Sequence, residues 1–172
     1  METFQFETIQ GKLSLICLDV VEPNNGRMLY KVKLTLNDID ITASYFGTWN
    51  YINCHLRNYS STSIDKKWFY IPKEGNHFLI HSETLQKEEL PYLSVSAVTF
   101  KGNYFTENHL IVFSSEEIIS KSLGSNKVCV LKQKAKEVYF QDITLLDATK
   151  LVLSLSDNTS QIVWLDTLQA LE

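Results

Sequence analysis

The histidines and cysteines are the residues best suited to metal binding or nucleophilic chemistry. His77 and His81 have a spacing that puts two side chains on one side of a helix or a strand. Cys54 and His55 could supply further ligands, but the short paired spacings typical of zinc sites are missing. Apolar residues at 78–80 fill the gap between the two histidines. The pattern therefore predicts a short buried strand with polar ends rather than a metal site.

A cysteine nucleophile would need a histidine as its base, and Cys54 with His55 or His109 offers that pair. No small-residue turn surrounds Cys54, and no serine lies in a G-x-S-x-G segment. We therefore expect Cys54 to be a packing residue on a predicted helix.

Asp19, Glu22, Asp38 and Asp40 are the carboxylates suited to general acid–base work or to sugar hydrolysis. Asp38 is accounted for by a predicted turn, and Asp40 by the solvent face of a predicted strand. The six glycines are spread singly, so no phosphate-binding loop is expected. We predict no catalytic residues, no metal site and no cofactor, and a chain that is not an enzyme.

The composition is that of one soluble globular domain. The chain has 172 residues, a formal net charge of −4, 44% apolar residues and 12% aromatic residues. This length predicts a single domain over residues 1–172, and the aromatic content excludes a disordered chain. DNA is not expected as a partner, because neutralising its phosphates needs a basic surface.

The cysteines and the N-terminus indicate a compartment. Cys17, Cys54 and Cys129 are odd in number and widely spaced, which is typical of reduced, buried thiols rather than disulfides. No basic segment followed by an apolar stretch opens the sequence, and no apolar run approaches the roughly 20 residues of a membrane span. We expect a cytoplasmic protein without a membrane partner.

Residues 30–45 carry the clearest local pattern, because apolar and polar residues alternate on either side of Asn37 and Asp38. This predicts two half-buried strands joined by a tight turn, since Asn and Asp tolerate the left-handed conformation that such a turn requires. The predicted register pairs Leu36 with Ile39 and continues in the same way to both ends of the segment.

A second hairpin is predicted near the C-terminus, from the apolar segments 151–155 and 162–165. A loop over residues 157–160 would pair Leu155 with Ile162. Both faces of these strands would then be apolar, which predicts a hairpin that is covered on both sides and central to the fold.

Other segments have weaker patterns. Residues 92–113 predict two strands joined by a turn at 101–103, with a bulge at 97–98. Spacings of three and four favour a helix over 48–59, with its apolar residues on one face. Short helical segments are expected at 48–59, 82–90, 166–171 and 115–123, the last being alternatively the outer strand of a hairpin.

Residues 108–116 resemble residues 149–157, which lie 41 positions later. A spacing near 40 is typical of propeller blades, but generic hairpins also resemble each other by chance, and we favour chance. The chain is thus predicted to be mainly β (α+β), with antiparallel hairpins forming a sandwich or half-open barrel and one to three short helices.

Aromatic residues are concentrated in residues 45–70. Trp and Tyr suit protein interfaces and sugar-binding faces, because they bury a large area at little entropic cost. Phe46, on the solvent side of its predicted strand, and Tyr51, on the polar side of the predicted helix, are not required for the core. With Arg57 they form the predicted exposed contact patch.

Lys132, Lys134 and Lys136 share one face of an extended segment. This spacing could meet an acidic partner or a nucleic acid. We favour a charged edge strand, because Lys at a sheet edge prevents edge-to-edge association.

A motif-free, mildly acidic β domain with surplus aromatic residues favours a binding function. The leading hypothesis is a cytoplasmic protein that binds and neutralises or regulates another protein, such as a toxin. Bacterial immunity proteins are an analogy of class for this hypothesis, with no shared motif behind it. The alternatives are a sugar- or lipid-binding β domain, a structural subunit that pairs through its sheet edge, and a small hydrolase whose site is assembled from distant residues.

Overall fold

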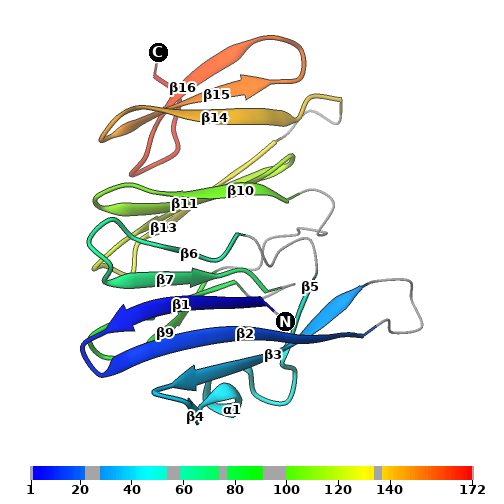
Figure 1. Ribbon diagram of the computed structural model, residues 1–172. Coiled ribbons are helices and arrows are strands. Elements are labelled where there is room, and N and C mark those ends of the chain that lie inside the picture. Colours follow the sequence, from blue (N-terminus) through cyan, green and yellow to red (C-terminus); the bar gives the residue numbers. More distant parts are fainter. Residues whose placement is uncertain are drawn as a thin grey trace. The chain divides into compact units, whose positions relative to one another are not determined.

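The fold was analysed in a computed structural model (Figure 1). The structure describes residues 2–21, 28–53, 59–73, 77–90, 100–133 and 137–171. The described strands form four antiparallel sheets, and a single short helix accompanies them. The predicted mainly β class with antiparallel hairpins is therefore confirmed.

The chain divides into two compact units, Met1–Leu93 and Ser94–Glu172. Each unit contains two of the four sheets. The single domain expected over residues 1–172 stays a prediction, because each unit is defined by its own internal contacts.

The first unit begins with a sheet whose strands are ordered β1-β2-β3-β4, with β5 also paired to β3. The elements are β1 (Glu2–Thr8), β2 (Gly11–Val21), β3 (Leu29–Leu36), β4 (Ile39–Asp40), α1 (Thr42–Phe46) and β5 (Tyr51–Asn53). On β2 and β3, Leu13, Leu15 and Leu34 are fully buried, and Leu15 lies opposite Leu34 in the register.

The second sheet of this unit has the order β6-β7-β8-β9. Its strands are β6 (Ser61–Thr62), β7 (Trp68–Ile71), β8 (Phe78–His81) and β9 (Lys87–Glu89). The rings of Phe6 on β1 and Phe69 on β7 lie 4.3 Å apart, so the two sheets of the unit share a core.

The second unit holds a sheet of order β10-β11-β12-β13 and a sheet of order β14-β15-β16. The strands are β10 (Phe100–Phe105), β11 (His109–Ser114), β12 (Glu117–Ser122), β13 (Val128–Lys132), β14 (Phe140–Asp147), β15 (Lys150–Leu155) and β16 (Ser160–Trp164). One apolar cluster joins the two sheets, with Ile111 and Phe113 from one and Leu151 and Leu153 from the other. Two antiparallel sheets on a common core are the sandwich form of packing.

Three successive sheets repeat at a fixed period. Their second strands, β7, β11 and β15, begin at Trp68, His109 and Lys150, which are 41 residues apart at each step. Consecutive antiparallel strands repeated at about 40 residues are the pattern of propeller blades. The similarity between residues 108–116 and 149–157 therefore belongs to a longer series, which begins with β7 in the first unit.

The turns of these sheets repeat with the strands. A side-chain oxygen accepts a backbone N–H two residues later before each second strand, at Asp65, Thr106 and Asp147. The same turn leads out of each third strand, at Thr84, Ser125 and Thr167. Such turns mimic a backbone turn and fix where the chain reverses, so the repeat is set by short polar residues and apolar strands together.

The first predicted hairpin is confirmed at its turn and wrong beyond it. Asn37 and Asp38 have φ values of 49° and 67°, and Leu36 lies opposite Ile39 as predicted. The chain then leaves the sheet and forms α1 in place of the expected strand over residues 41–45. The N-terminal part of β3 pairs instead with β5, where Tyr30 lies opposite Ile52.

The C-terminal hairpin exists, but its register differs from the prediction. Asn158 takes a φ of 65°, and Leu155 N donates to Thr159 O, so the loop is shorter than expected. Ile162 consequently lies opposite Val152 instead of Leu155. An odd shift moves side chains to the other face of a sheet, so Ile162 is 37% exposed while Val163 is fully buried.

The remaining local predictions have different outcomes. The turn expected at 101–103 lies inside β10, whereas residues 115–123 form β12, the strand alternative. In the described parts of 48–59 and 82–90, the structure has the strands β5 and β9 where helices were expected. The bulge expected at 97–98 and the residues Cys54, His55 and Arg57 lie outside the described residues.

His77 and Tyr70 form a buried polar contact in the second sheet. Both side chains are almost fully enclosed, and their rings are stacked. Burial raises the pKa of Tyr70 and lowers that of His77 to about 4. The tyrosine hydroxyl is therefore the donor and His77 Nδ1 the acceptor of the hydrogen bond that joins them.

We predict that Leu153→Ala lowers the free energy of unfolding by about 3 kcal/mol, while Ile162→Ala lowers it by less than about 1 kcal/mol. Leu153 is fully buried in the cluster of the second unit, whereas Ile162 is on the outer face. Urea denaturation of both variants measures the difference. Equal losses would show that the C-terminal strands pair in the other register.

The protein should lose stability as the pH falls from about 6.5 to about 4, because the unfolded chain takes up a proton that folded His77 resists. The loss attributable to His77 is about 3 kcal/mol. Denaturation across this pH range measures it, with the slope diminished in His77→Gln. The matched His81→Gln variant retains the slope, since His77 is still present. An unchanged slope in His77→Gln would assign the effect to other groups.

Candidate binding surface around helix α1

Helix α1 exists because Thr42 ends the ladder between β3 and β4. Leu34 N donates to Thr42 Oγ1 over 2.9 Å, so the amide that a paired strand would use is already satisfied. Asp40 Oδ1 accepts from both the N–H and the hydroxyl of Thr42, which holds the first residue of the turn. These bonds lower the pKa of Asp40. The chain therefore turns outward into α1.

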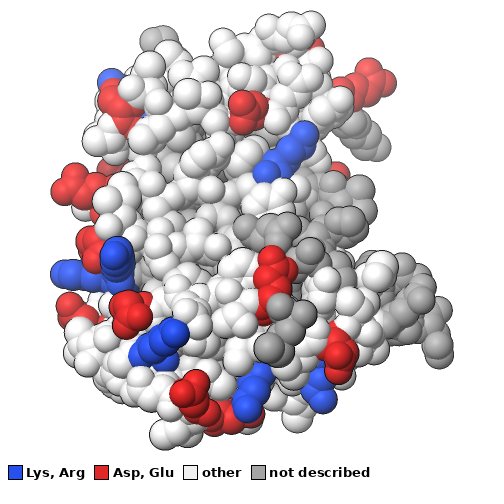
Figure 2. All heavy atoms as spheres, in the orientation of Figure 1, with Lys and Arg blue, Asp and Glu red and all other residues white. Residues whose placement is uncertain are grey.

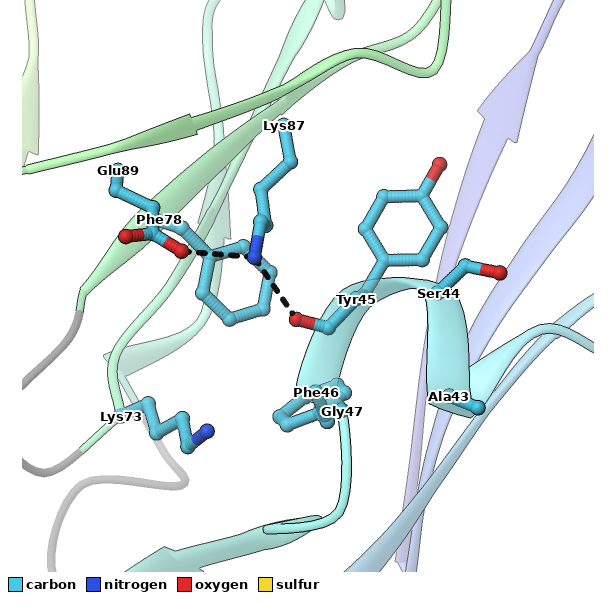
Figure 3. Close-up of a pocket in the computed structure, with 9 residues that line it drawn as sticks. All are labelled: Ala43, Ser44, Tyr45, Phe46, Gly47, Lys73, Phe78, Lys87 and Glu89. Atoms are coloured by element: carbon cyan, nitrogen blue, oxygen red, sulfur yellow. Dashed lines mark hydrogen bonds and ion pairs between the residues drawn. The ribbon is translucent and has the colours of Figure 1, made fainter.

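A pocket of about 260 Å³ lies between α1 and the neighbouring sheet of the same unit (Figure 3). Phe46 from α1 and Phe78 from β8 contribute its aromatic wall, with ring centroids 5.3 Å apart in an edge-to-face arrangement. Lys73, Lys87 and Glu89 line the rest of the pocket. Tyr45 O closes one side, because it accepts from Lys87 Nζ over 3.2 Å.

The two lysines are held differently. Lys87 Nζ lies 2.8 Å from Glu89 Oε1, and this hydrogen bond lowers the pKa of Glu89. Lys73 Nζ lies 5.4 Å from the centre of the Phe46 ring, within cation–π distance. Desolvation, followed by repulsion from Lys87, lowers the pKa of Lys73. Among the described residues, Lys87 thus has a carboxylate in ion-pair contact, whereas Lys73 is attracted by Glu89 only from a longer distance.

A second hollow of about 350 Å³ also adjoins α1 and is lined by Asp40, Thr42 and Asn50 among others. Gly47 lines both hollows and has φ 61° and ψ −135°, a conformation that only glycine adopts without strain. Asn50 returns the chain to the sheet, because Val32 N donates to Asn50 O and Asn50 Nδ2 donates to Val32 O. The segment between Thr42 and Asn50 is therefore fixed at both ends.

Trp49 and Tyr51 form an aromatic pair beside this segment. Their ring centroids are 5.1 Å apart, and Trp49 is 55% exposed. Tyr51 is half-buried, so one edge of the pair faces solvent. A large exposed indole supported by a second ring is typical of an interface anchor.

The predicted contact patch is only partly assembled. Phe46 was expected to be exposed, but it is 4% exposed, because α1 turns it toward Phe78. Tyr51 lies on β5 rather than on a helix, and its contact with Trp49 places it at the surface. Arg57 is outside the described residues, so its place in the patch stays a prediction.

Sequence reasoning missed Lys73, Lys87 and Trp49. Trp49 had been assigned to the apolar face of a helix that the structure replaces with β5. Lys73 and Lys87 belong to no local sequence motif. Lys73 lies between β7 and β8, whereas Lys87 is the first residue of β9. Only the fold of that hairpin brings them beside α1.

A second group of reactive side chains lies in the other unit. His109 Nε2 lies 3.1 Å from Asp166 Oδ1, and Cys129 Sγ donates to Asp166 O over 3.0 Å. Lys127 Nζ is 3.8 Å from the same carboxylate. These contacts tie the turn after β16 to β11 and β13, which is a structural role. In the described part of the chain, no three His, Cys, Asp or Glu side chains gather as a metal site.

Charged side chains of both signs are interspersed on the face seen in Figure 2. Lys132 lies on β13, at one end of the described order of its sheet, and pairs with Glu117 over 2.6 Å. Its predicted position on an edge strand is therefore confirmed, while Lys134 and Lys136 are outside the described residues. Within the described ranges, no helix has the length and apolar character of a membrane span.

Comparison with known proteins relates the chain to a solved structure. No protein-family model and no curated protein matches it. The crystal structure of BamB from Moraxella catarrhalis is similar, with a TM-score of 0.50 and 12% sequence identity. The match covers 99% of this chain and 51% of that chain, so this chain spans about half its length. The similarity shows a common fold of antiparallel sheets.

Proposed function

We propose that this chain is a non-enzymatic module that binds another protein through the surface around α1. The surface consists of α1, the segment to Asn50, the aromatic pair Trp49–Tyr51 and the pocket that holds Lys73. The exposed aromatic pair carries the proposal, because an indole and a phenol in tilted contact at the surface offer a large contact area with little rotamer freedom to lose.

The scaffold supports this function. Hydrogen bonds fix the surface segment at Thr42 and at Asn50, so the aromatic pair is held before any partner arrives. Preorganisation of this kind lowers the entropy cost of binding. The adjoining pocket adds a polar element to an aromatic anchor, which is how interfaces combine affinity with specificity.

The narrower form of the proposal is a cytoplasmic protein that neutralises or regulates its partner, as bacterial immunity proteins do with toxins. The net charge of −4 favours a partner with a basic surface, through long-range steering outside the lysine pocket. Mixing the purified chain with candidate toxins and measuring the toxins' residual activity tests this form. Binding without loss of activity would leave a regulatory or scaffolding role.

We predict that Tyr51→Ala weakens partner binding about tenfold or more and changes the melting temperature by less than about 2 °C. Tyr51 is half-buried at the surface, and the β5 backbone pairing does not depend on its side chain. Pull-down from the source lysate, followed by titration of the identified partner, measures the first effect. Thermal unfolding measures the second.

The matched control is Tyr139→Ala, which removes a 47% exposed tyrosine from the other unit. It should bind the partner as the unchanged protein does. A large drop in melting temperature for Tyr51→Ala would show that this residue belongs to the core. Equal loss of binding in both variants would place the interface elsewhere.

A further inference from the structure

We infer that the pocket between α1 and β9 is an acceptor site for an acidic side chain of a partner protein. The inference deepens the proposed function and rests on it. It assigns the hollow lined by Lys73, Lys87, Glu89, Phe46 and Phe78 to a glutamate or aspartate carboxylate, which would lie beside the Lys73 ammonium group.

Figure 3 shows Lys73, Lys87, Phe46 and Phe78 around one space, whereas the side chains of Tyr45 and Ser44 point away from it. Lys73 enters from one side and Lys87 from the other, while Phe46 and Phe78 supply apolar surface between them. A glutamate side chain has matching parts, because its methylene groups can cover an aromatic ring while its carboxylate meets an ammonium group. The volume of about 260 Å³ holds one such side chain together with water.

The charge balance of the pocket favours the binding of one anion. Glu89 already accepts from Lys87, at 2.8 Å, and Lys87 also donates to Tyr45 O. No described carboxylate lies within ion-pair distance of Lys73, which Glu89 reaches only as a longer-range attraction. Among the described residues that line the pocket, two ammonium groups and one carboxylate give a local excess of one positive charge. A bound carboxylate would compensate that charge, and its attraction would offset the cost of desolvating the Lys73 ammonium group.

The donors of the pocket favour a side-chain carboxylate over a chain terminus. Terminal carboxylates are captured by clusters of free backbone N–H groups. Here Ser44 N and Gly47 N are already donating, to Ile41 O and Ala43 O respectively. The Lys73 ammonium group is a point charge on a flexible stem, and it matches a carboxylate that is also carried on a flexible stem.

The test uses capped hexaglutamate as the probe and follows lysine side-chain signals by NMR. The signals of Lys73 and Lys87 should shift saturably with hexaglutamate and remain unchanged with capped hexaglutamine. Lys73→Gln should weaken hexaglutamate binding about tenfold, because it removes one charge-assisted hydrogen bond. The matched control Lys12→Gln removes an exposed lysine of the same unit and should leave binding within about twofold.

Three outcomes of the peptide and anion titrations would overturn the inference. Equal weakening by Lys12→Gln would show unspecific attraction. Equal binding of hexaalanine with a free C-terminus would identify a terminal carboxylate as the ligand, and equal binding of inorganic phosphate would identify a site for free anions. Partner capture separates this inference from the proposed function: a partner bound without response to Lys73→Gln refutes only the pocket. If hexaglutamate binds but no protein partner is captured in a way that depends on Tyr51, the proposed function is refuted.

Discussion

The hydrogen bond from Leu34 N to Thr42 Oγ1 determines where the pairing of β3 with β4 ends, and the candidate binding surface depends on it. An amide in a buried strand must have an acceptor. By supplying a side-chain oxygen, Thr42 replaces the carbonyl that a continued strand would have offered. The chain is thereby free to form α1, and Asn50 returns it to β3 through two hydrogen bonds with Val32. The alternating pattern of residues 41–45 is thus overruled by one side-chain hydrogen bond.

The core of the second unit depends in a similar way on one turn. Asn158 adopts a left-handed conformation, and this sets the register of β15 and β16. In that register Val163 joins Leu151 and Leu153 in the core, and the opposite face carries Ile162. The identity of the strands is thus decided by their apolar residues, whereas the face each residue occupies is decided by the loop.

These two turns explain how much of the structure could be predicted. The strands β3, β11 and β15 follow from alternating or continuous apolar runs, because burial of one or both faces leaves little choice. The turn at Asn37 and Asp38 follows from the left-handed tolerance of both residues. The exit at Thr42 could not be foreseen, because it requires a contact with Leu34 across the hairpin. Phe46 and the pocket lysines were misjudged or missed for the same reason, since their surroundings come from segments that are distant in the sequence.

The sheets from β6 onward follow a regular repeat, whereas the candidate binding surface lies where the first sheet departs from it. From β7 onward, second strands begin every 41 residues, and the same polar turns recur at their ends. Repetition of this kind is typical of scaffolds built from one recurring strand unit. The first sheet departs from the pattern, because α1 and the segment to Asn50 interrupt the strands that pair with β3. Loops held by a rigid scaffold are where binding residues are most often found. The departure at α1 exposes Trp49 and forms the lysine pocket, so the irregular part of the first unit is the part best suited to recognise a partner.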